Sequence, residues 1–127
     1  RETLLQASEP EVYLCSANAV AETGELVNID GTGNRVSMTL FGPEKLYFVV
    51  GVNKIAEDLP AAMERARNVA APKNAVRIGG KTPCAVKGDK CYRCESPDNI
   101  CHATVILERP VNGMKAEVVL IDEELGY

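Results

Sequence analysis

A short apolar strand that runs directly into a loop with two glycines is the feature that most limits how this chain can fold. Residues 24–35 read GELVNIDGTGNR, and the apolar side chains of Leu26, Val27 and Ile29 predict the strand. A loop of this composition exposes backbone N–H groups without a Cβ in the way, and a helix that follows it adds attraction for an anion. The stretch is either the place where the chain approaches a ligand or a turn between two core elements, and the sequence leaves both open.

Candidate ligand-binding residues lie in this loop and beyond a later strand. Gly31 and Gly33 would offer N–H groups, and Arg35 would offer a forked set of cationic donors. Asn53 and Lys54 follow the apolar run at residues 45–52, at the strand end where ligands gather in open α/β sheets. The full predicted set is Asn18, Asn28, Asp30, Gly31, Thr32, Gly33, Asn34, Arg35, Asn53 and Lys54. The asparagines and Asp30 are equally typical of ordinary turns.

Strands and one long helix account for most of the remaining chain. Strands are predicted at residues 12–15, 45–52, 76–78, 103–107 and 116–121, a helix tail at 1–7, and either a strand or a short helix at 36–40. The run at 45–52 is apolar enough for a strand buried on both faces. Asp58 is a predicted N-cap for a helix that Pro72 ends, and Asn112 with Gly113 predicts a hairpin between the last two strands. The whole indicates one α/β domain over residues 1–127, with a mixed sheet and flanking helices.

Four cysteines form the strongest chemical signal. Cys84, Cys91, Cys94 and Cys101 follow the spacing C-x6-C-x2-C-x6-C, in a segment that glycines and prolines should keep irregular. Four thiols this close together, without a secretory signal, favour a metal centre over disulfides. The spacing does not separate an iron–sulfur cluster from zinc, because both are bound by four cysteines.

Charge and hydropathy exclude two classes of partner. The net charge of −4 and the sequence pI near 5.0 argue against nucleic acid, which requires a basic face. No apolar run approaches the roughly 18 residues that span a bilayer, and no signal peptide is evident, so a cytoplasmic protein without membrane contact is expected. The chain begins at Arg1, which suggests that an upstream segment is missing.

Several stretches together resemble the lactate-utilisation, or LUD, domain family. They are SANAV at 16–20, ETGELVNIDGTGNRV at 22–36, FGP at 41–43, VGVNKI at 50–55, AAP at 70–72, TPC at 82–84 and DEELGY at 122–127. The resemblance implies a Rossmann-like α/β fold, similar to that of the sugar-phosphate isomerase and coenzyme A transferase group. It also implies a link to the bacterial oxidation of lactate to pyruvate.

Three functions follow as hypotheses. The first, which we favour, is a component of a lactate-utilisation redox system that binds a small anionic metabolite at residues 31–35, carries a metal centre at the four cysteines and works with other lactate-utilisation subunits. The second is an enzyme of the coenzyme A transferase type, in which the carboxylate of Glu22 attacks a thioester. The third is a non-catalytic module in which zinc stabilises a docking loop. The single histidine favours binding or electron transfer over hydrolysis.

Overall fold

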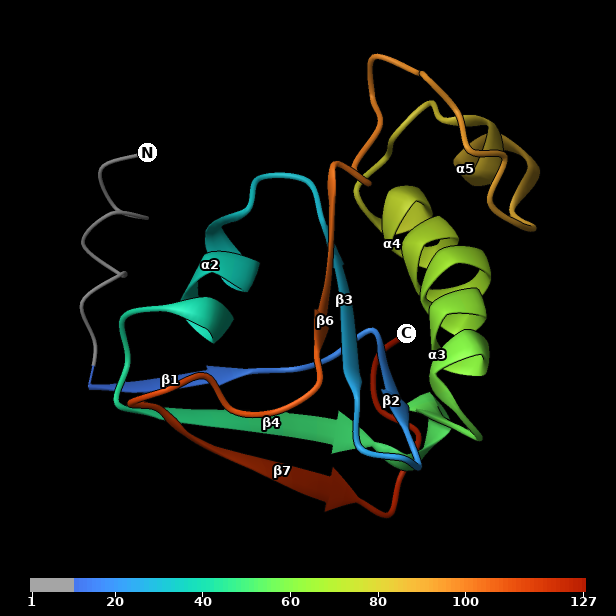
Figure 1. The fold of residues 1–127 in the computed structure, drawn as a ribbon. Helices are drawn as coiled ribbons and strands as arrows, with labels where there is room; N and C mark the ends of the chain where they lie inside the picture. The colour runs from blue at the N-terminus through green and yellow to red at the C-terminus, as the bar shows by residue number, and fades with distance from the viewer. Residues whose placement is uncertain (1–10) are drawn as a thin grey trace.

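Two sheets and a helical layer make up the protein. The computed structural model describes residues 11–127, so the helix tail expected at residues 1–7 lies outside the described part. The first sheet is parallel, with strand β4 (Lys45–Gly51) between β1 (Val12–Cys15) and β7 (Lys115–Ile121) (Figure 1). β4 is the central strand, with β1 hydrogen-bonded along one edge and β7 along the other.

The second sheet is mixed and lies between the first sheet and the helices. Its order is β5-β2-β3-β6, with β2 at Ala19–Ala21, β3 at Leu26–Asp30, β5 at Ile55–Ala56 and β6 at Ala103–Leu107. β2 runs parallel to β5, whereas β3 runs antiparallel to both β2 and β6. The structure therefore confirms an α/β fold with a mixed sheet and flanking helices, although the strands divide into two sheets rather than one.

Alternating side chains give the second sheet two buried faces. Val20, Leu26 and Leu107 pack toward the first sheet, where they meet Leu46 and Phe48. On the opposite face, a second cluster joins the two layers, and its members are Ala19, Ala21, Val27 and Ile29 from the sheet with Ala62, Ala66 and Ala71 from the helices. Small alanines on both sides let the helix approach the sheet closely. This close packing fixes the ends of β2 and β3 relative to the helices.

The long helix continues through Pro72. Asp58 caps α3 (Leu59–Arg65) as expected, because its side chain accepts a hydrogen bond from the N–H of Ala61 at 2.8 Å. The π-helical segment η2 (Ala66–Ala70) then leads into α4 (Ala71–Arg77). The expectation that Pro72 ends the helix is wrong, because Pro72 lies in the first turn of α4, where a missing N–H is tolerated. The strand expected at residues 76–78 is also wrong, because α4 extends to Arg77.

The last two strands are present, but the hairpin between them is not. β6 pairs with β3 in the mixed sheet, and β7 pairs with β4 in the parallel sheet. The turn itself forms, with Gly113 at φ 86° and the N–H of Met114 bonded to the carbonyl of Val111 at 3.1 Å. The chain after β6 therefore turns as expected but crosses to the other sheet.

Three shorter features complete the comparison with the sequence. Residues 36–40, which fitted two alternatives, belong to the helix α2 (Asn34–Leu40). The cysteine segment is not irregular throughout as expected, because Cys84 lies in the short helix α5 (Pro83–Lys87). η1 (Val52–Lys54) is one turn of 3-10 helix. β4 is buried on one face only, since Val49 is 41% exposed. No helix within residues 11–127 is long and apolar enough to cross a bilayer.

Candidate functional site

A cavity of about 540 Å³ opens beside the carboxyl end of β3. Its walls come from the link between β1 and β2, the loop before α2, Lys54, one face of α4 and the last two residues of the chain. The volume lies in the range of about 300–1,000 Å³ that is typical of small-molecule sites. Seven of the predicted ligand-binding residues line this cavity, namely Asn18, Asp30, Gly31, Thr32, Asn34, Arg35 and Lys54.

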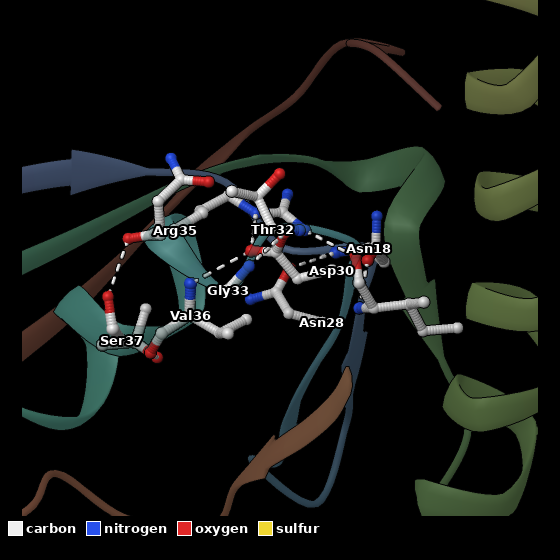
Figure 2. A network of polar contacts seen from close by, with 11 residues as sticks. Asn18, Asn28, Asp30, Thr32, Gly33, Arg35, Val36 and Ser37 are labelled. Carbon is white, nitrogen blue, oxygen red and sulfur yellow. Dashed lines mark hydrogen bonds and ion pairs between the residues drawn. The ribbon is translucent and has the colours of Figure 1, made fainter. Parts of the chain in front are cut away.

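Asp30 organises the loop at one edge of the cavity. Its carboxylate accepts hydrogen bonds from the N–H groups of Thr32 at 3.1 Å, Gly33 at 3.2 Å and Val36 at 3.2 Å (Figure 2). Burial alone would raise the pKa of Asp30, but these hydrogen bonds and the charge of Arg35 outweigh it, so the pKa lies below its ordinary value. Asp30 is therefore ionised at neutral pH and serves as an anion built into the protein.

This arrangement changes the expected role of the glycine loop. Of the two N–H groups that were expected to receive a ligand anion, at Gly31 and Gly33, that of Gly33 already binds the carboxylate of Asp30. The N–H of the intervening Thr32 binds the same carboxylate. Gly33 takes a left-handed conformation with φ 84°, which lets the loop turn into α2. Gly31 has a different role, because a Cβ there would lie 3.1 Å from the carbonyl oxygen of Ile100, closer than an ordinary contact. Gly31 thus shapes the wall of the cavity, whereas Gly33 shapes the turn into α2.

Lys54 supplies the cavity with a buried positive charge. Only 7% of the residue is exposed, and its ammonium group lies 3.2 Å from the hydroxyl of Ser16. Within residues 11–127, no carboxylate lies close enough to form an ion pair with it. Burial lowers the pKa of Lys54, and the neighbouring charges of Arg65 and Arg35 lower it further. A buried cation of this kind is costly until an anion approaches it.

The arginines around the cavity are engaged to different degrees. Arg35 donates to the carbonyl of Ile29 at 2.8 Å and lies 3.8 Å from the Asp30 carboxylate. Arg65 is held by the backbone carbonyls of Asn53 and Asn18. Burial lowers the pKa of Arg65, although a guanidinium stays charged at neutral pH. Arg77, at the end of α4, is exposed, and its guanidinium bonds no described residue besides Asn74, so it can turn toward a ligand.

Three other predicted ligand-binding residues lie outside the lining. Asn28 is buried and accepts a hydrogen bond from the N–H of Asn18 at 3.1 Å, while Asn18 accepts one from the N–H of Ile29 at 2.6 Å (Figure 2). Gly33 starts α2, as described above. The side chain of Asn53 bonds the N–H of Leu125 at 3.0 Å and the carbonyl of Gly126 at 3.3 Å. Asn53 thereby fastens the C-terminal segment next to the cavity.

Glu22 lies away from this cavity. It follows β2 in an exposed turn, where its N–H bonds the carbonyl of Ala56 at 2.8 Å, and its side chain is absent from the cavity lining.

Three residues that line the cavity were not predicted from the sequence, namely Ser16, Asn74 and Arg77. Arg77 gave no sequence signal, because it lies beyond the proline that was expected to end the helix.

The four cysteines of the array surround a second, smaller cavity. Its volume is about 220 Å³, and Cys84, Cys91, Cys94 and Cys101 all line it as free thiols. Burial raises the pKa of Cys101, and the nearby Cys91 and Cys84 raise it further. Within residues 11–127, no group of three or more histidine, cysteine or acidic side chains is placed to hold a metal ion. The fifth cysteine, Cys15, lies apart in β1.

Comparison with known proteins identifies the family. The sequence model of the LUD domain matches residues 1–121. Neither the curated proteins nor the solved structures include a match to the chain. Since the match spans nearly all of the 127 residues, the chain belongs to the LUD domain family, which links it to lactate utilisation.

Proposed function

We propose that this LUD domain binds a small organic anion, of the class of lactate and pyruvate, in the cavity beside β3. The observation that carries the proposal is Lys54, which is 7% exposed, lines the cavity and has the Ser16 hydroxyl as its polar partner. Desolvation of an ammonium group without a counter-charge costs several kcal/mol. A bound carboxylate would supply that counter-charge.

The balance of charge in the lining supports an anionic ligand. Among residues 11–127, the lining holds three cationic side chains, those of Arg35, Lys54 and Arg77, and one side-chain carboxylate, that of Asp30. Asp30 is already bound by three backbone N–H groups and lies beside Arg35, so its charge is largely neutralised within the loop. Lys54 and Arg77 then remain for the ligand.

The polar groups around Lys54 suit a carboxylate that also carries a hydroxyl or carbonyl group. Ser16 and Asn18 both line the cavity, and the Ser16 hydroxyl and the Asn18 side-chain amide can each donate a hydrogen bond to an oxygen atom of a ligand. Ile29, Ala70 and Ala71 add apolar surface for a carbon chain. A phosphate is less well served, because Asp30 already accepts hydrogen bonds from the N–H groups of Thr32 and Gly33 in the loop and of Val36 in the first turn of α2. The cavity is larger than lactate requires and leaves room for a longer acid.

A metal centre at the four cysteines forms the second part of the proposed function. The four cysteines that line the second cavity would be its ligands, and the family's link to lactate utilisation supports a component of a lactate-oxidising system that works with other subunits of that system. The anion site and the metal centre are separate claims, since each rests on its own residues.

Titration of the isotope-labelled protein tests the anion site. Lactate and pyruvate should shift the backbone amide signals of Asn18, Thr32 and Ile100, which line the cavity. Lactamide is the matched control, because it keeps the shape of lactate and lacks its charge. Equal shifts with lactamide, or shifts confined to residues remote from the cavity, would contradict the proposal.

A further inference from the structure

The cavity beside β3 is long, and a cationic side chain stands at each of its ends. We propose that its ligand is a dicarboxylic acid, whose 2-hydroxy or 2-oxo end binds at Lys54 and whose second carboxylate binds at Arg77. Both residues line the cavity. The inference rests on the proposed anion site and names the class of acid that this site would select.

The helical layer sets the length of the cavity. α3, η2 and α4 follow one another without a break beside the mixed sheet (Figure 1). Arg65, in the last turn of α3, donates to the backbone carbonyl of Asn53, so this part of the helix lies beside Lys54. Arg77 ends α4 about three helical turns, or roughly 15 Å, further along. A three-carbon acid cannot bridge the two ends.

One face of the helix forms the wall between the two charges. Ala70, Ala71, Asn74 and Arg77 recur at the spacing that places residues on one face of a helix, and all four line the cavity. The two alanines bring no polar group, and Ile29 of β3 also lines the cavity. The wall is therefore apolar between two polar ends, which suits the methylene chain of a dicarboxylic acid.

Arg77 is placed to hold the second carboxylate. Side chains on a helix lean toward its N-terminus, and the guanidinium of Arg77 accordingly lies beside Asn74, whose side-chain oxygen accepts from Nε at 3.0 Å and Nη2 at 2.8 Å. This contact directs the charge back along α4. Within residues 11–127, no acidic side chain pairs with Arg77. Its remaining N–H groups can bind a carboxylate through two parallel hydrogen bonds.

The two ends differ in burial, which gives the ligand a direction. Lys54 is 7% exposed, and Gly126 packs against it, since a Cβ on this glycine would lie 3.1 Å from Lys54 Nζ. Arg77 is exposed. The 2-oxo or 2-hydroxy group therefore belongs at the buried end, where Ser16 and Asn18 offer polar partners. The second carboxylate keeps part of its hydration at the exposed end, so its binding there carries little desolvation cost.

The charges of the lining also favour two carboxylates. One carboxylate is enough to balance Lys54, and Arg35 already lies 3.8 Å from Asp30. Arg77 is the remaining cation among the described residues of the lining. A ligand with one carboxylate would leave Arg77 without a counter-charge, whereas a dicarboxylic acid supplies one.

Calorimetric titration with matched acids tests the inference. 2-Oxoadipate, with a carboxylate at each end, is compared with 2-oxohexanoate, which has the same chain and a methyl group at its far end. 2-Oxopimelate and 2-oxoheptanoate form a second pair with a longer chain. We expect the dicarboxylate of at least one pair to bind wild type about tenfold more tightly than its partner, as a hydrogen-bonded charge contributes. In R77M this preference should disappear, while the affinity for pyruvate stays unchanged.

Lys73 provides the control for general electrostatic attraction. It is an exposed lysine of α4 that is absent from the cavity lining. The variant K73M therefore removes an equal charge from the same helix and should keep the preference for the dicarboxylate. An equal loss of this preference in K73M and R77M would overturn the inference, because any cation on α4 would then suffice. Circular dichroism checks that both variants are folded.

The other outcomes separate this inference from the anion site itself. Equal affinities within both pairs of acids, with pyruvate still bound, would overturn the second carboxylate subsite and leave the anion site standing. Absence of binding by every acid, pyruvate included, would overturn both. The variant K54M should weaken the binding of pyruvate and of the dicarboxylates alike, so a defect at the Lys54 end is distinguished from a defect at Arg77.

Discussion

The ammonium group of Lys54 lies 3.2 Å from the hydroxyl of Ser16, in a residue that is only 7% exposed. Ser16 lies just beyond β1 and Lys54 ends the helical turn after β4, so the contact joins the ends of two adjacent parallel strands. The carboxyl ends of parallel strands are where α/β proteins place ligand groups. The pair therefore supports an anion site at this edge, and the charge of Lys54 leads to the first prediction.

Anion binding should weaken at alkaline pH. The pKa of Lys54 lies below its ordinary value of 10.5, chiefly because of burial. As the pH rises through that lowered pKa, Lys54 loses its proton and its attraction for a carboxylate. Calorimetric titration with pyruvate should show a constant affinity near neutral pH and a decline that begins before pH 10.5. A constant affinity up to that pH would contradict the role of Lys54.

Asp30 should stabilise the fold. Replacing it with alanine removes the acceptor of three backbone hydrogen bonds and the partner of Arg35. We expect D30A to lower the free energy of unfolding by about 2 kcal/mol at neutral pH, as for the loss of a strong helix cap. D30N, which keeps one acceptor oxygen, should lose less. Urea denaturation measures both variants.

The stabilising effect of Asp30 should depend on pH in a defined direction. The folded-state pKa of Asp30 is lowered, so its contribution is fully present above the unfolded-state value, near 3.8. It is lost as the pH falls through the lower folded-state value. The difference in unfolding free energy between wild type and D30A should therefore be constant from pH 5 to 7 and shrink below about pH 4. A difference that grows in acid would contradict this account.

Gly31 should not tolerate a side chain. A Cβ at this position would stand 3.1 Å from the carbonyl oxygen of Ile100, in the wall shared by the two cavities. We expect G31A to cost about 1–3 kcal/mol of stability through this steric conflict. The neighbouring variant T32A, at an exposed position, should change stability by less than about 0.5 kcal/mol. Thermal unfolding of the two variants decides the comparison.

Cys15 should react slowly with alkylating reagents. Burial raises the pKa of its thiol to about 11, against a partly compensating effect of Arg35. Since the thiolate is the reactive form, modification by iodoacetamide at pH 8 should be much slower than that of free cysteine and should accelerate as the pH approaches 11. Mass spectrometry of a variant that keeps Cys15 as its only cysteine follows the reaction. Fast modification at pH 8 in the folded protein would show that the thiol is not protected.

Local signals in the sequence identified most of the elements. The apolar periods of Leu26 to Ile29 and of residues 45–51 gave strands β3 and β4, and Asp58 gave the start of α3. The hairpin at Asn112 and Gly113 failed because turn chemistry is local, whereas β6 and β7 gain longer ladders from β3 and β4 in different sheets. The prediction that Pro72 ends the helix also failed, because the π-helical segment that precedes α4 has no simple sequence signature.

The sequence predicted which residues lie at the candidate site better than it predicted what those residues do there. Asp30 and Gly31 do line the cavity, but no local pattern indicates that the Asp30 carboxylate accepts hydrogen bonds from the N–H groups of Thr32 and Gly33. The burial of Lys54 depends on contacts with Ser16 and the C-terminal segment, which are far away in the sequence. Arg77 enters the site only because α4 continues beyond Pro72.

Replacement of Lys54 tests the central claim most directly. Calorimetric titration with pyruvate should detect binding to wild type and at least a tenfold weaker affinity in K54M, a loss of about 1.4 kcal/mol or more. The matched control is K115M, which removes an exposed lysine at the start of β7. K54M should be no less stable than wild type, because it removes a buried charge that has no carboxylate partner within residues 11–127. Equal affinity for pyruvate in wild type, K54M and K115M would contradict the anion site.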